Sequence, residues 1–166
     1  MRETNRILRI VLFVCCLACV TAGPAKAFAA DTWTLTITEQ TREFPLLRCR
    51  ILTGEIFHMR TIHSLALTRY VQVYRITEEG EIMLSGAIYE SEGGGFPALG
   101  DGILTKKDGK YYMDKMDRLI GGTWSFRVSP FSQETFVYRE VEVPLFRILP
   151  EGTVVLIRIE KERNKE

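Results

Sequence analysis

Apolar and polar residues alternate with a period of two along much of this sequence. In residues 32–38 the side chains of Trp33, Leu35 and Ile37 fall on one face, and the threonines fall on the other. Successive side chains of a β-strand point to opposite faces, so this alternation predicts a strand with one buried face. The same pattern returns in residues 47–51, 123–129 and 155–159.

Glycine-containing turns separate these stretches. The pair Asp108-Gly109, flanked by lysines, is the strongest hairpin signal in the chain. Residues 113–119 are expected to make one short helical turn. The spacing predicts about nine strands, and hence an all-β fold that is either an antiparallel β-sandwich or a partly closed β-barrel. Three further turns place a glycine where a positive φ is expected: Gly54, Gly80 and Gly152.

The N-terminal segment has the layout of a secretory signal peptide. A basic start with three arginines precedes the unbroken apolar residues 10–20, and Ala27-Phe28-Ala29 offers a cleavage site of small residues. The apolar run is short for a transmembrane helix, which needs about 20 residues. A retained N-terminal anchor, or a lipid attached at Cys19, is the alternative. Each interpretation places the protein in the periplasm or elsewhere outside the cytoplasm.

This interpretation divides the chain into a signal peptide at 1–29, a single β domain at 30–160 and a charged tail at 161–166 that frays. Three of the four cysteines lie in the signal, so Cys49 alone remains and forms no internal disulfide. Cleavage removes four of the 22 basic residues and one of the 21 acidic residues, which leaves 18 against 20. This balance implies no nucleic-acid partner. Any membrane contact is expected only through the anchor.

A histidine continues the apolar face of residues 56–63. His63 shares this face with Phe57 and Met59. Three roles are open for it: a hydrogen-bonded structural residue, a ligand-contacting residue or a general base. Neighbouring strand residues point to opposite faces, so Ser64 cannot pair with His63 as nucleophile and base on a regular strand. His58 and His63 likewise point apart. No metal ion or other cofactor is expected.

A glycine-rich loop at 91–102 is the second candidate. Gly93, Gly94 and Gly95 permit main-chain angles that other residues avoid, and Phe96-Pro97 follows them. Exposed N–H groups of such a loop form a nest for anions, or the loop is a tight crossover between strands. No lysine and hydroxyl residue follow the glycines, so the loop is no nucleotide-binding P-loop.

Two stretches, IFHMRTIHSLALTRYVQVYRI at 56–76 and YESEGGGFPALGDG at 89–102, together resemble the bacterial family known as domain of unknown function 1850. The family pairs a strand ending in His-Ser with a later element of glycines and a proline. Tyr74 lies where the family's next strand carries a tyrosine. The resemblance implies a candidate binding surface that consists of His63, Ser64, Tyr74, Gly93, Gly94, Gly95, Phe96 and Pro97.

Members of the family are small exported or membrane-anchored proteins, often encoded beside tripartite transporters of the TAXI type. The resemblance therefore implies an accessory or interaction module of a solute transport system, with the permease or its periplasmic solute-binding protein as partner. Catalysis is not the favoured expectation. The alternative function is an envelope hydrolase that uses His63 as general base.

Overall fold

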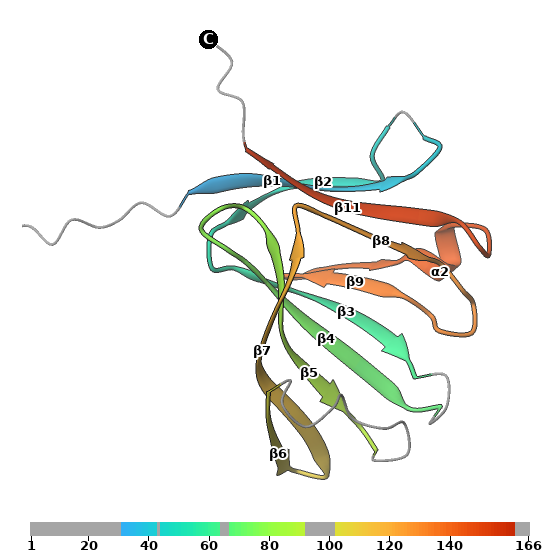
Figure 1. Cartoon of the computed structure of the whole chain (residues 1–166). Coiled ribbons are helices and arrows are strands. Elements are labelled where there is room, and N and C mark those ends of the chain that lie inside the picture. Colours follow the sequence, from blue (N-terminus) through green and yellow to red (C-terminus); the bar gives the residue numbers. More distant parts are fainter. Residues whose placement is uncertain (1–30, 43, 64–66, 92–101, 162–166) are drawn as a thin grey trace, which may run out of the picture.

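Two antiparallel β-sheets stacked as layers make up the fold (Figure 1). The computed structural model describes residues 31–42, 44–63, 67–91 and 102–161. One sheet has the strand order β2-β1-β11-β8, and the other has the order β10-β9-β3-β4-β5-β7-β6. The elements are β1 (Thr32–Glu39), β2 (Leu47–Leu52), β3 (Ile56–Ile62), β4 (Arg69–Ile76), β5 (Ile82–Tyr89), β6 (Ile103–Lys107), β7 (Lys110–Gly121), β8 (Thr123–Arg127), β9 (Thr135–Tyr138), β10 (Val141–Pro144), α2 (Leu145–Ile148) and β11 (Val154–Lys161).

The predicted antiparallel sandwich is confirmed. The described residues contain eleven strands, where the alternation predicted about nine. Each sheet ends in two edge strands, so the described part of the chain forms an open sandwich and not a closed barrel. Strand β11 includes Lys161, one residue beyond the expected end of the domain. Within the described ranges the α-helical element is a single turn, too short to cross a membrane.

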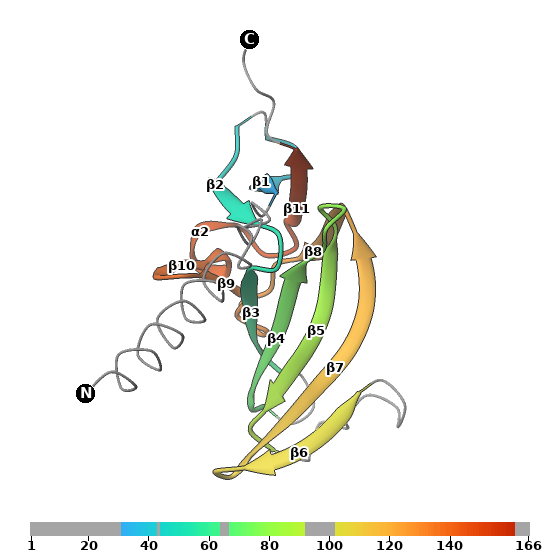
Figure 2. The same cartoon turned by 90° about the vertical axis from the view of Figure 1, so that its left-hand side faces the viewer.

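The apolar faces expected from the alternation line the space between the sheets. Leu35 and Ile37 of β1 are fully buried, as are Ile157 of β11 and Phe57 of β3. Burial of such side chains is the main favourable term in folding, at about 25 cal/mol per Å² of apolar surface. The core therefore lies where the four-stranded sheet covers the seven-stranded sheet (Figure 2).

One of the crossings between the two sheets takes place at a pair of glycines. Strand β7 belongs to the seven-stranded sheet, and after Gly121 and Gly122 the chain continues as β8 of the four-stranded sheet. Gly121 has a φ of 102°, a conformation that suits glycine because it has no Cβ. The consecutive strands β7 and β8 therefore belong to different sheets and connect the two layers.

The predicted hairpin at Asp108-Gly109 is confirmed. Asp108 (φ 51°) and Gly109 (φ 75°) connect β6 to β7, and Lys107 pairs with Lys110 across the turn. Two central residues with positive φ match the right-handed twist of the strands that they join. Positive φ is also found where it was expected, at Gly54, Gly80 and Gly152.

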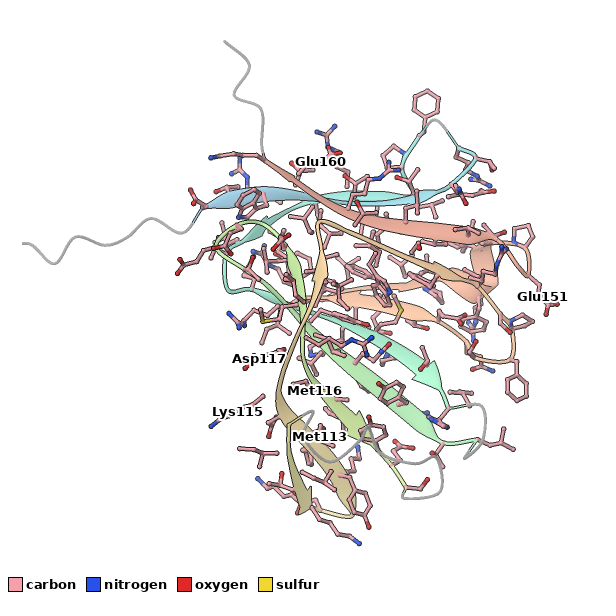
Figure 3. All side chains as sticks on the ribbon, viewed as in Figure 1. Met113, Lys115, Met116, Asp117, Glu151 and Glu160 are labelled. Atoms are coloured by element: carbon pink, nitrogen blue, oxygen red, sulfur yellow. The ribbon has the colours of Figure 1, made fainter. Side chains whose placement is uncertain are left out.

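The expected helical turn at 113–119 is wrong, because these residues belong to β7. Register shifts between β5 and β7 leave β7 with more residues than the β5 segment it faces, and Lys115 (φ 56°) and Asp117 (φ 43°) adopt left-handed backbone. Both side chains point away from the sheet (Figure 3). Such β-bulges interrupt the period of two, which explains why the segment resembled a helix.

A hydrogen-bond network around Glu55 ties the sheets together at one end. The Tyr138 hydroxyl on β9 lies 2.6 Å from Glu55 Oε2 and 3.1 Å from the Arg50 carbonyl oxygen on β2. Glu55 also accepts from the Leu52 backbone N–H (2.8 Å) and from Arg139 (2.7 Å). Burial alone would raise the pKa of Glu55, but these hydrogen bonds outweigh it and lower the pKa.

Candidate functional site

The outer face of the seven-stranded sheet, which points away from the core, carries a groove of about 600 Å³. We call it the outer groove. It is lined by Arg60, Thr61, Ile62, Arg69, Val71, Ile88, Glu90, Lys110, Tyr112, Gln133, Thr135, Glu142, Pro144, Phe146 and Arg147. This volume lies within the range typical of small-molecule sites.

Strand register explains how residues so far apart in the chain line one groove. Side chains directly opposite each other on paired strands share a face of the sheet. One such row crosses six adjacent strands, from β10 through β9, β3, β4 and β5 to β7. It consists of Pro144, Thr135, Arg60, Val71, Ile88 and Tyr112.

The floor of the outer groove is apolar. Val71 and Ile88 form a direct cross-strand pair, and Ile62 is the diagonal neighbour of Val71 on β3. All three side chains are half-buried although they face away from the core. Phe146, which follows β10 on α2, and Tyr112 on β7 also line the groove and are half-buried.

Charged side chains surround this floor. The lining includes the cations Arg60, Arg69, Lys110 and Arg147 and the acids Glu90 and Glu142, which gives a net charge of +2. Arg60 forms an ion pair with Glu142. The groove therefore presents positive charge on a chain whose expected exported part is slightly negative.

The remaining cations of the groove are less engaged. Among the described residues, no carboxylate lies within ion-pair distance of Arg69, Lys110 or Arg147. Arg147 lies over the ring of Phe146, with 5.4 Å between its Cζ atom and the ring centroid. Continuation of the β4–β5–β7 register places Glu90 between Arg69 and Lys110. The arrangement can attract and orient an anion.

His58 lies next to the groove on the same face of β3. It faces Val73 on β4 and Val137 on β9, with Arg60 two residues along. Burial lowers the pKa of His58 first of all, and the positive charge of Arg60 lowers it further. The imidazole therefore stays neutral to lower pH than an exposed histidine.

His63 lies on the opposite face of the sheet from the outer groove. Its ring meets Tyr70 edge-on at 6.1 Å between centroids, and Tyr70 stacks on Tyr89 at 4.8 Å. Tyr89 and Tyr111 belong to a small hydrophobic cluster separate from the main core, and Tyr70 packs against this cluster. The groove formed by the described residues is therefore not built around the predicted histidine.

Tyr74 is also remote from His63. Its side chain is 2% exposed and packs on Phe57 (5.2 Å between centroids) and on Trp124 (4.6 Å). Tyr74 pairs with Phe57, six residues before His63 on β3, which corresponds to roughly 20 Å along the strand. The structure thus does not bring these two residues together. Their roles in binding stay predictions.

The other predicted site residues lie outside the described residues: Ser64, Gly93, Gly94, Gly95, Phe96 and Pro97. Within the described ranges, no group of three or more His, Cys, Asp or Glu side chains is placed to hold a metal ion.

Sequence reasoning missed the outer groove. Its residues occupy the alternate positions that the period-two pattern assigns to solvent, such as Arg60 and Arg69. A signal was present in Ile62, Val71 and Ile88, which are apolar at positions where the outer face of a half-buried strand is expected to be polar. An apolar patch on such a face is informative because it has no role in the core.

The fold is an open β-sandwich, and its seven-stranded sheet carries a groove with an apolar floor and charged side chains around it. The model of the family called domain of unknown function (DUF1850) matches residues 57–145. The chain belongs to this family. The match begins in β3 and ends in α2, so it contains most of the outer groove. No significant match to a curated protein or to a solved structure is found.

Proposed function

We propose that this protein is an exported recognition module that assists a solute transport system of the TAXI type. The outer groove is the observation that carries the proposal. It combines an apolar floor, a net charge of +2 and cations without ion-pair partners among the described residues. Such a surface suits binding, whereas a hydrolase would need a nucleophile or activated water beside its base.

Two further arguments support this role. The signal-peptide layout of residues 1–29 supports export of the domain to the side of the membrane where periplasmic solutes are captured. The chain's membership of the family supports the resemblance, and the resemblance implies a genomic association with TAXI-type transporters. The permease or its periplasmic solute-binding protein is then the partner.

The open sandwich supplies a rigid support for this surface. The groove residues of β3, β4, β5 and β7 lie on paired strands whose other face packs in the two apolar clusters. Binding groups held on strands are positioned more firmly than groups on loops. We therefore place recognition on the sheet face.

Co-purification from the native host tests this proposal. The full chain carries a C-terminal tag and is cross-linked in cells, and the captured proteins are identified by mass spectrometry. We expect recovery of the neighbouring permease or solute-binding protein, and reduced solute uptake when the gene is deleted. Recovery of neither component, with uptake unchanged on deletion, would contradict the proposal.

A groove variant and a matched control sharpen this test. Tyr112→Ala removes a half-buried groove side chain on β7, and Leu119→Ala removes a side chain on the same strand outside the groove. Leu119 is 55% exposed, so its loss leaves the core intact. We expect Tyr112→Ala to reduce uptake and Leu119→Ala to leave it unchanged. An equal reduction of uptake by the two variants would show that the outer groove has no specific role in uptake.

The hydrolase alternative stays a prediction. His63 contacts Tyr70, while Ser64 lies outside the described residues. Among the described residues, no observation favours this alternative over the recognition role.

A further inference from the structure

We propose that the outer groove binds a small organic acid, with its carboxylate on Arg69 and its apolar body on the floor of Ile62, Val71 and Ile88. The inference rests on the proposed recognition role of the groove and names the class of ligand. Three features of the lining carry it: an arginine without an ion-pair partner among the described residues, an apolar floor and an acid that limits the charge of the ligand.

We assign the ligand carboxylate to Arg69 because the neighbouring Arg60 already forms an ion pair with Glu142. The register pairs Arg60 with Val71 and Ile62 with Arg69, so the two arginines are diagonal neighbours on one face. Glu142 holds Arg60, whereas no carboxylate among the described residues lies within ion-pair distance of Arg69. A guanidinium presents parallel N–H donors that match the two oxygens of a carboxylate.

The floor beside Arg69 selects a ligand with an apolar body. In the same block of four residues, Ile62 and Val71 alternate with the two arginines, and Ile88 extends the apolar surface onto β5. Apolar contact adds affinity in proportion to the area removed from water. An anion without such a body, for example acetate, would leave this floor uncovered.

Glu90 limits the charge that the site accepts. It lies between Arg69 and Lys110 in the continued β4–β5–β7 register, so these three residues together carry a charge of +1. A second anionic group on the ligand would lie close to the carboxylate of Glu90 and is disfavoured, because like charges repel. The site therefore suits a monocarboxylate better than a ligand with several negative charges.

Titration calorimetry with octanoate tests the inference, on protein purified from its native host in the form that the host produces. Octanol supplies the apolar body without the charge, and acetate supplies the charge without the body. We expect octanoate to bind more tightly than either compound. We also expect its affinity to fall as NaCl rises from about 50 mM to about 500 mM, because salt screens exposed charges. Equal binding of octanol and octanoate would overturn the inference.

Substitutions locate the carboxylate. Arg69→Gln is expected to weaken octanoate binding about tenfold, since it removes the charged fork. The matched control is Arg48→Gln, which removes an exposed arginine from β2 in the other sheet. Glu142→Gln releases Arg60 and raises the net charge of the groove, so we expect about threefold tighter binding. Its control is Glu160→Gln, which removes an exposed acid from β11 in the four-stranded sheet.

A spectroscopic measurement covers the case in which Arg69→Gln disturbs the fold. With the unsubstituted protein, octanoate is expected to shift the NMR methyl signals of Ile62, Val71 and Ile88 but not that of Val155 in the core. Shifts at Val155 with none at the floor would overturn the proposed site. Tighter binding of a glutamate-rich peptide, in competition with octanoate, would instead identify an acidic protein segment as the occupant and would also overturn it.

The two proposals fail in different ways. If octanoate does not bind but a transporter component is captured from cells, the ligand class is wrong and the recognition role stands. If octanoate binds at Arg69 but no component is captured and uptake is unchanged, the groove is an organic-acid site and the transport role is wrong.

Discussion

Arg60 on β3 and Glu142 on β10 form an ion pair that reaches across β9, although 82 positions separate them in the sequence. The pair borders the outer groove and takes up one of its positive charges. Both side chains remain about half exposed, at 44% and 55%. It therefore shapes the charge of the groove more than it stabilises the fold.

The first prediction concerns the stability of this pair. In a double-mutant cycle with Arg60→Gln and Glu142→Gln, we expect a coupling energy of about 0.2–1 kcal/mol, because water screens exposed ion pairs. Urea unfolding of the four proteins measures it. A coupling well above this range would identify the pair as a structural support of β10.

The second prediction concerns Trp33 and Gly80. A Cβ built on Gly80 would lie 2.4 Å from the Trp33 ring, and Gly80 has a φ of 76°. Trp33 is held in place by its Nε1–H, which donates to Thr53 Oγ1 at 3.0 Å. Gly80→Ala is therefore expected to lower the free energy of unfolding by about 2–4 kcal/mol.

Gly54→Ala is the matched control for Gly80→Ala. Gly54 has a similar φ of 83°, but a Cβ there would meet nothing within 4 Å. We expect it to cost only the backbone strain, about 1 kcal/mol. Equal losses for the two variants in urea unfolding would show that contact with the Trp33 ring adds nothing.

The third prediction concerns the Tyr138 hydroxyl. Tyr138→Phe removes its hydrogen bond to Glu55 and leaves that half-buried carboxylate with fewer donors. We expect a loss of about 1–3 kcal/mol in the free energy of unfolding and a rise in the pKa of Glu55. Chemical denaturation and NMR titration of the carboxyl signal measure the two effects. Tyr112→Phe, in the outer groove, serves as control and is expected to have little effect.

The fourth prediction concerns pH and His58. The folded pKa of His58 lies below its ordinary value of 6.5, so the unfolded chain binds a proton more readily than the folded chain. The contribution to stability is complete above about pH 6.5 and is lost as the pH falls through the folded pKa. We therefore measure the free energy of unfolding from about pH 7.5 down to pH values below the unfolded pKa of about 6.5. Over this range we expect His58→Gln to lose less stability than the unsubstituted protein.

Arg60→Gln provides a graded comparison for this effect. It removes the cation that lowers the pKa of His58 but leaves burial in place, so it is expected to reduce the acid sensitivity only in part. Urea midpoints measured at each pH give the comparison. Identical pH profiles for the unsubstituted protein and His58→Gln would contradict the prediction.

The core could be predicted from sequence because each strand reports its own buried face. Trp33, Leu35 and Ile37 are buried as their alternation predicted, and Asp108-Gly109 forms the predicted turn. These features depend on neighbours in the chain, which the sequence displays directly. The β-bulges of β7 could not be predicted. The positive φ of Lys115 and Asp117 accompanies register shifts in the pairing of β7 with β5, and the sequence does not display this pairing.

The outer groove could not be predicted for a similar reason. It requires six strands in a fixed order and register, and the sequence specifies neither for strands that are distant in the chain. Arg69 and Lys110 become neighbours of the same floor only through β5, which lies between their strands. The resemblance named His63 and the glycine loop. The outer groove lies on the opposite face of the sheet from His63, and the glycines of the loop lie outside the described residues.

Strands β7 and β8 join the two sheets through Gly121 and Gly122. This connection matters for the choice of a shorter fragment for expression. A fragment limited to residues 57–145 would retain β8 but would lack β11, its hydrogen-bonded neighbour, and also β1 and β2. Phe57 and Tyr74 would then face water where a lid of aliphatic side chains had been. Expression boundaries should therefore follow the closed hydrophobic interior and extend from β1 to β11.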